Sequence, residues 1–435
     1  MDEIDEALAR LDPTTADTAG PVVESLMGVD ETRVPLSTLN QSDVQHLLWH
    51  ALPSKWFVDD AEHHEMAWAL GDFLESAGLD RYAAICRDPR THEILSAWHV
   101  DPDAGAAACL QAQRDSGLVP PDTDALTFGE VMGSDEARVN AGVAVLLEKR
   151  ILAGDLDPAE RGFRARSRRL VEAHLRTPAL GYDGRSPLSV VHEERIGFWL
   201  HRMDRTPNQL WSSVAPLVVG APEVPEGAEL SLAPALAVLE AVGDGVALTG
   251  AGYLPAKLAL ELDERFGWSE DMIGARPRGE SQIPRLMFVD EHLRARRLLT
   301  KRGNRLSVSA EGRRCLADPA RLWRTLTADR SKHAFESDIL AVMAAVLLAG
   351  TSVRWDDLDD QVVAVLAGKW RAPNGVPVGP EDVHWTEVEW YRLGLSFGWW
   401  GSDHGYGLRG LRMNEVGRAA AVSLFRSVAT RPMRR

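Results

Sequence analysis

The sequence predicts a mainly α protein, in which an N-terminal all-helical domain is followed by two tandem winged-helix-like units with small β-hairpins. Three observations predict this fold class. Apolar residues recur at helical spacing through most of the chain, Pro and Gly residues separate the periodic segments, and one order of helices and short strands occurs twice in the C-terminal half.

Composition limits the classes of protein that fit the chain. Its 435 residues are enough for several domains, and 45% apolar with 26% charged residues is ordinary globular composition. The cysteines Cys86, Cys109 and Cys315 are too far apart in sequence to indicate a disulfide framework or a thiolate metal site, so we expect a cytoplasmic protein without a cofactor. No apolar run is long enough to span a membrane, so we expect no membrane partner.

Residues 1–35 are predicted to form an acidic, largely disordered leader. Nine carboxylates stand against two arginines in this segment, with Thr, Gly and Pro residues between them. Such a composition favours a solvated chain, although a short helix is compatible with the residues from Ile4 to Leu11.

Residues 36–219 are predicted to form the all-helical domain. Asn40 or Ser42 can cap a first helix that runs through Leu52, and Asp59 or Asp60 can cap a longer helix that ends at Gly78. Further helices, separated by Pro and Gly, are predicted over residues 81–87, 92–100, 104–116, 135–153, 158–175, 188–203 and 208–219.

A polar stretch rich in Pro and Gly predicts a linker over residues 220–230. The first winged-helix-like unit, residues 231–330, follows it. A β-hairpin is expected to turn at Gly303-Asn304, and Ser309 is a natural N-cap for the helix that begins at Ala310. Before the hairpin we expect helices over residues 233–242, 255–266 and 282–297 and a short strand over 246–249.

The second winged-helix-like unit, residues 331–435, repeats this order. The segment from Leu411 to Arg418 matches the segment from Leu306 to Arg313 at a Leu, an apolar residue, an N-cap residue, a Gly and an Arg, at a constant offset. The other matching elements are helices over 335–349, 357–367 and 381–395, a strand over 352–354 and a hairpin through 405–407.

Two segments of the first unit carry a family resemblance. Leu248–Pro255 reads LTGAGYLP and Leu299–Gly312 reads LTKRGNRLSVSAEG. This pairing resembles a pattern in uncharacterised actinobacterial proteins with winged-helix-like C-terminal regions. The resemblance covers roughly 200 residues, implies the fold, and implies no activity. The second unit lacks the LTxxGxLP element.

Charge identifies a candidate surface on the first unit. The net charge of −16 argues against a protein that coats nucleic acid non-specifically, but residues 285–314 hold nine basic residues against Asp290, Glu291 and Glu311. Winged helices commonly bind DNA through the third helix and the hairpin. The predicted nucleic-acid contacts are Arg294, Arg297, Lys301, Arg302, Arg305, Arg313 and Arg314. The competing interpretation is a basic face that is solvated or docks on another part of the chain.

Two other charged segments lead to different predictions. The third helix of the second unit carries Glu381, Asp382, Glu387 and Glu389 against Arg392, so we expect this unit to pack against protein. The segment from Arg161 to Arg169 is either a second phosphate-binding surface or an ordinary exposed helix.

No catalytic motif occurs in a credible context. His46 and His50 have the spacing of a helical zinc site, with Glu62, His63 and His64 nearby, but Leu47 stands where a zinc peptidase carries its glutamate. The GxSxG match from Gly394 to Gly398 follows a helix rather than a strand. Whether the chain is an enzyme stays open, because a site between domains need leave no short motif.

Two non-enzymatic functions therefore remain open from the sequence. The first is a non-enzymatic binding protein that contacts duplex DNA through the basic hairpin of the first winged-helix-like unit. The second is a protein-protein adaptor or assembly factor in which both units dock on protein.

Overall fold

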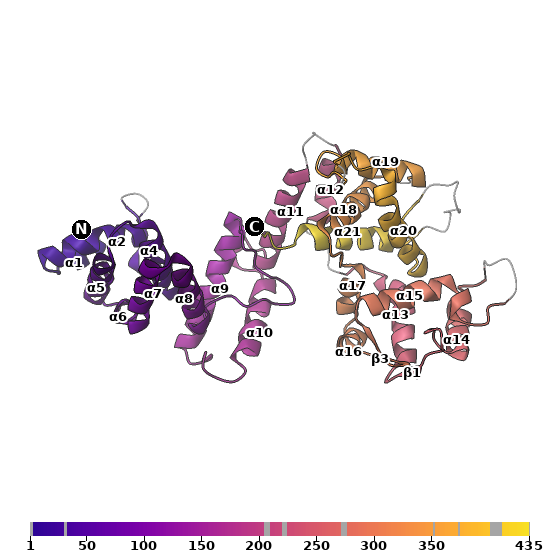
Figure 1. The fold of residues 1–435 in the computed structure, drawn as a ribbon, viewed down its shortest axis with the longest axis horizontal. Coiled ribbons are helices and arrows are strands. Elements are labelled where there is room, and N and C mark those ends of the chain that lie inside the picture. The colour runs from indigo at the N-terminus through magenta and orange to yellow at the C-terminus, as the bar shows by residue number, and fades with distance from the viewer. Residues whose placement is uncertain are drawn as a thin grey trace. The chain divides into compact units, whose positions relative to one another are not determined.

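The computed structural model describes residues 3–29, 33–203, 209–219, 224–270, 276–350, 353–372, 375–400 and 411–434. The protein is mainly α-helical, with one small three-stranded antiparallel sheet in the described residues, as the sequence predicts (Figure 1). The chain divides into two compact units. Residues 1–191 with 432–435 form the N-terminal unit, and residues 192–431 form the C-terminal unit.

The N-terminal unit is built from short helices that acidic residues and prolines delimit. Asp59 makes a reciprocal capping box with Glu62, while Asp88 and Asp101 each cap a helix whose first residue is Pro. The helices are α1 (Glu3–Leu8), α2 (Pro13–Met27), α3 (Gln41–His46), α4 (Leu52–Lys55), α5 (Asp60–Ser76), α6 (Asp80–Arg87), α7 (Pro89–Val100), α8 (Pro102–Asp115), α9 (Ser134–Leu152) and α10 (Phe163–Arg176), and α11 (Pro187–Met203) leads into the C-terminal unit.

The acidic leader is not disordered where the structure describes it. Helices α1 and α2 pack on α5, and Ile4, Val22, Val23 and Met27 are buried. Arg10 also donates to the carbonyl oxygen of Ser76 at 2.6 Å. The prediction was wrong because the carboxylates lie on solvent-facing positions, while the few apolar residues recur at helical spacing and bury one face.

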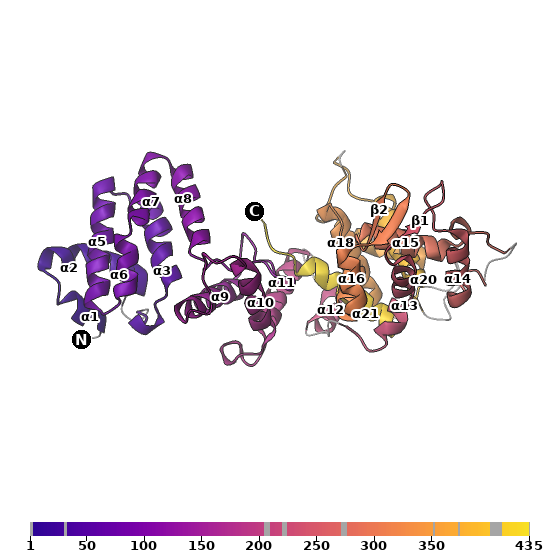
Figure 2. The same cartoon turned by 90° about the horizontal axis from the view of Figure 1, so that it is seen from below.

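The C-terminal unit contains the sheet. Strand β3 (Arg305–Val308) lies between β1 (Val246–Ala247) and β2 (Leu299–Arg302), and both pairings are antiparallel. Figure 2 labels β1 and β2 in this unit. The helices are α12 (Gln209–Val218), α13 (Ala228–Val242), α14 (Ala256–Phe266), α15 (Pro284–Ala295), α16 (Ala310–Ala317), α17 (Pro319–Thr327), α18 (Ala334–Ala349), α19 (Trp355–Leu366), α20 (Pro380–Ser396) and α21 (Glu415–Ala429).

Helix α13 begins earlier than the sequence predicted. It starts at Ala228, inside the segment expected to be a linker, after Gly227 has turned the chain with a left-handed φ of 77°. Pro234 lies inside the helix, where it removes one intrahelical hydrogen bond. Residues 220–223 of that linker lie outside the described part of the chain.

Two segments of the C-terminal unit share one backbone pattern. Leu298 donates to the Leu293 carbonyl and accepts from the Ser309 amide, and Trp399 in the same way donates to Gly394 and accepts from Asn414. Ser309 and Asn414 then cap α16 and α21 by accepting from the amides of Gly312 (2.9 Å) and Gly417 (2.8 Å). The predicted N-caps are thus confirmed.

The strands of the second segment are reduced to isolated bridges. Val353 pairs with Leu411, and Trp400 pairs with Met413. The hairpin turn expected at residues 405–407 lies outside the described residues. Within the described ranges, no helix is long and apolar enough to cross a membrane.

Candidate nucleic-acid interface

The basic hairpin, residues 299–308, presents its charged side chains to solvent. Leu306 and Val308 point into the core, whereas Lys301, Arg302 and Arg305 are exposed, as the alternation along a strand requires. Gly303 makes the turn with a left-handed φ of 59°. The hairpin therefore holds three cations close together on a defined backbone.

The turn of the hairpin is attached to the residue after β1. The Leu248 amide donates to the Asn304 carbonyl at 2.8 Å, and the Asn304 side chain donates back to the Leu248 carbonyl at 2.8 Å. These two bonds fix the turn. Lys301, Arg302 and Arg305 form no ion pair within the part of the chain that the structure describes.

Arg297 also belongs to this exposed surface. It has a left-handed φ of 58° between α15 and β2, and its carbonyl accepts from the Ser309 hydroxyl at 2.7 Å. A non-glycine residue in this conformation is uncommon and is retained here by the surrounding hydrogen bonds. The guanidinium is left in solvent.

The other three predicted contacts are engaged within the protein. Arg294 contacts both carboxylate oxygens of the buried Asp290. Its Nη2 lies 2.5 Å from Oδ2, and its Nε donates to Oδ1 at 3.0 Å. Arg314 pairs with Glu311 at 2.9 Å, and Arg313 lies 3.7 Å from the exposed Asp244. Exposed pairs such as the last are weak and leave the charge available. Arg294, in contrast, is structural.

The carboxylates behind Arg294 form a buried pair. Burial raises the pKa of Glu280 to about 7, with a smaller contribution from Asp290, while the Leu254 amide donates to Glu280 at 2.5 Å. Burial also raises the pKa of Asp290, and Arg294 opposes that shift. If Arg294 moved away from Asp290 to reach a phosphate, the two carboxyl groups would lose the positive charge that compensates them.

Helix α15, the third helix of the predicted unit, offers no exposed cation. Its exposed residues are Pro284, Glu291 and Ala295. One face packs on α20, where the Arg392 guanidinium lies 5.2 Å from the Phe288 ring centre and the His292 and Phe397 rings are 6.0 Å apart. Access to base edges through α15 is therefore poor, although the hairpin stays open.

The Arg-rich segment of α10 is partly neutralised. Arg166 pairs with Glu160, and Arg168 pairs with Asp124. Arg161, Arg164 and Arg169 are exposed. The arginines spread around the helix instead of converging on one face, because Ser167 and Val171 occupy its buried side.

The enzyme-like motifs are structural. Ser396 of the GxSxG match is buried inside α20 and donates to the Arg392 carbonyl at 3.0 Å, so it cannot act as an exposed nucleophile. The His46 and His50 rings lie 5.3 Å apart, and His64 bonds to His92 rather than to them. Among the described residues no group of three metal-ligating side chains converges.

The acidic third helix of the second segment holds one buried carboxyl. Glu387 of α20 is fully buried and neither of its oxygens has a hydrogen-bond partner. Burial, and then the neighbouring Asp359, raise its pKa to about 9. The other acids on the helix, Glu381, Asp382 and Glu389, are exposed, so α20 as a whole repels phosphate.

A pocket beside α15 was not predicted from the sequence. Its volume is about 460 Å³, and its walls come from the end of α15, from residues 328–333, from α18 and α20, and from Leu424 of α21. These segments are far apart in the sequence, so no short motif could reveal the pocket. Comparison with protein-family models, curated proteins and solved structures found no match to this chain.

Proposed function

We propose that the chain is a non-enzymatic binding protein and that its basic hairpin contacts the phosphate backbone of duplex DNA. The observation that carries this proposal is the cluster of Lys301, Arg302 and Arg305, exposed on a hairpin whose turn is fixed by two hydrogen bonds. Such cations displace counterions from DNA and gain affinity by doing so.

The order of elements supports a winged-helix-like interpretation of this region. It runs α13, β1, α14, α15, β2, β3, and the middle strand of the sheet is β3. In a winged helix the β2–β3 hairpin is the wing, which lies against the DNA backbone. The matched hydrogen bonds around Leu298 and Trp399 support a second unit of the same kind.

Phosphate contact without base readout is the form of DNA binding that fits. Helix α15 exposes Glu291 and no cation, and Arg294 is committed to Asp290. Base recognition needs Arg, Asn or Gln side chains at the groove. We therefore propose binding that depends on salt and changes little with DNA sequence.

The test is the salt dependence of duplex binding, measured by fluorescence anisotropy on the full chain. Changing Lys301, Arg302 and Arg305 together to Ala should lower the slope of log K against log salt by about 3, because each phosphate contact contributes about 0.9. The matched control changes Lys55, Arg114 and Lys149 to Ala, which alters net charge equally at exposed positions outside both basic segments.

Two results would contradict the proposal. The first is no binding of the wild-type chain at low salt. The second is an equal loss in the control variant, since that would show an effect of net charge and not of the hairpin.

A protein adaptor is the second candidate function. It is favoured by the packing of α15 on α20, because a surface that a DNA-binding winged helix leaves open is here occupied by protein. An adaptor would bind an acidic protein segment through the same hairpin. If the hairpin variant loses a protein partner while duplex DNA never binds, the adaptor replaces the DNA proposal.

A further inference from the structure

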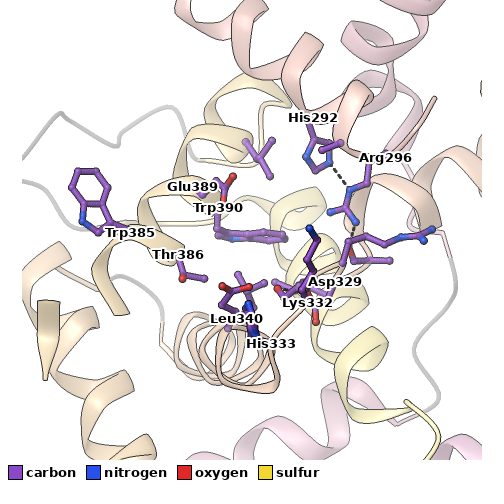
Figure 3. Close-up of a pocket in the computed structure, with 17 residues that line it drawn as sticks. His292, Arg296, Asp329, Lys332, His333, Leu340, Trp385, Thr386, Glu389 and Trp390 are labelled. Atoms are coloured by element: carbon purple, nitrogen blue, oxygen red, sulfur yellow. Dashed lines mark hydrogen bonds between the residues drawn. The ribbon is translucent and has the colours of Figure 1, made fainter. Parts of the chain in front are cut away.

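The pocket between α15, α18 and α20 has the dimensions of a small-molecule site. Its volume of about 460 Å³ is within the usual range for such sites, and it lies wholly inside the C-terminal unit. Figure 3 shows the lining residues converging on it, with Trp390 at their centre. None of its residues belongs to the basic hairpin.

Arg296 brings an unpaired positive charge to this pocket. Its Nη1 donates to the Ala328 carbonyl at 2.5 Å, and its Nε lies 3.3 Å from Nε2 of His292 (Figure 3). No carboxylate pairs with it in the described part of the chain. Burial, and then the nearby Arg330, lower its pKa to about 10, while Asp329 and Glu389 act from a distance against that shift. A partly buried charge without a carboxylate in direct contact is costly, so an anion placed here would be stabilised.

His292, which lies beside Arg296, carries no charge. Burial lowers its pKa to about 3, so the ring is neutral, and Nε2 lies 3.0 Å from the Leu326 carbonyl. A neutral ring that donates to this carbonyl has no lone pair on Nε2 for Arg296. The guanidinium therefore keeps donor capacity toward the pocket.

The acids that line the pocket set a limit on the ligand's charge. Asp329 is compensated, because Arg431 lies 2.6 Å from it and Ser331 donates to its other oxygen at 2.6 Å. Glu336 and Glu389 also line the pocket, together with the cations Arg330 and Lys332. The two glutamates oppose a doubly charged phosphate more strongly than a singly charged carboxylate.

The rest of the lining suits a flat apolar body. Trp390 is only 5% exposed, and its indole N–H has no hydrogen-bond partner. Leu340, Leu393 and Leu424 complete an apolar wall.

We propose that this pocket binds a small organic monocarboxylate with a planar apolar body, held by Arg296 at its carboxylate and by Trp390 along its ring. Binding in this pocket is independent of DNA binding. The chemistry of the lining selects an aromatic carboxylate as the ligand class.

The test is ligand-observed NMR and calorimetry on the full chain with benzoate and indole-3-acetate, each beside its primary amide. We expect saturable binding of at least one acid and at least about tenfold weaker binding of its amide, as loss of a charge-assisted bond predicts. Arg296→Gln should weaken the acid by a similar factor, and Leu340→Phe should block both forms by filling the pocket. Arg114→Gln, at an exposed position outside every proposed site, is the matched control and should bind as wild type does.

Three outcomes with the acids and amides would overturn the proposal. They are no saturable binding of any acid, equal binding of acid and amide, and wild-type affinity in the Arg296→Gln or Leu340→Phe variant. Adenosine monophosphate forms a separate arm, and tighter binding of this phosphate than of either carboxylate would refute the assigned class. Thermal melting identifies a variant that has failed to fold, and the remaining variant then decides.

Discussion

At the scale of single residues, Glu387 makes stability depend on pH. Its folded-state pKa of about 9 lies above the value of about 4.3 for an unfolded chain. Between these values the folded protein keeps a proton that the unfolded chain has released, so stability is full at the acid end and falls as pH rises.

Glu387→Gln should remove this dependence, because the amide has nearly the same shape and does not titrate. We expect the variant to gain stability relative to wild type by up to about 1.4 kcal/mol per pH unit as pH rises from about 5.5 to about 8.5. Urea unfolding across that range measures the effect. Glu389→Gln, exposed on the same helix, should follow wild type, and parallel curves for all three proteins would show that Glu387 does not hold its proton.

Local residue chemistry was predictable where a short motif sets it. Ser309 and Asn414 were identifiable as caps because a cap needs only a short side chain and an open amide three residues on. The pairing of Arg294 with Asp290 follows from their i, i+4 spacing and could have been predicted. The raised pKa of Glu387 could not be predicted, because it depends on burial and on Asp359, which lies on another helix, α19.

At the scale of elements, two glycines test whether the repeated segments are equivalent. A Cβ on Gly312 would clash with the Leu298 carbonyl, and one on Gly417 would clash with the Trp399 carbonyl. Both glycines lie in the first turn of a helix, at corresponding places in the two segments. The backbone must approach closely there, and only Gly allows it.

Gly312→Ala and Gly417→Ala should each destabilise the protein by about 3 kcal/mol, the usual scale for overpacking against a rigid backbone. Chemical denaturation of the full chain measures this. Gly250→Ala, where a Cβ meets no atom within 4 Å, is the control and should stay within about 0.5 kcal/mol of wild type. A large effect at only one of the two helix positions would contradict their equivalence.

Element order was more predictable than element partners. The hairpin, its turn and the helices around it followed from periodicity and turn residues. The prediction of disorder for residues 1–35 was wrong because it rested on the many carboxylates and not on the amphipathic pattern of α1 and α2. The cover that α20 places over α15 depends on packing between segments about a hundred residues apart, which periodicity does not encode.

At the scale of the whole molecule, separate apolar cores stabilise the two units. One core lies within residues 196–429, and the described N-terminal residues contribute two others. Glu148 of α9 stabilises the N-terminal unit, since it accepts from Arg81 (2.6 Å), from the Tyr82 hydroxyl (3.1 Å) and from the Gln41 amide (3.0 Å). It thereby connects α9 to α3 and α6.

Glu148→Ala should remove the acceptor that these three donors share and destabilise the N-terminal unit by about 2 kcal/mol. Because its contacts lie within that unit, we expect faster hydrogen exchange in peptides from residues 33–191 and unchanged exchange in peptides from 224–431, as measured by mass spectrometry. Glu93→Ala, at an exposed position of α7, should leave both sets unchanged. Faster exchange in both units would mean that the cores unfold together, and the stability of the hairpin and pocket would then depend on the N-terminal helices.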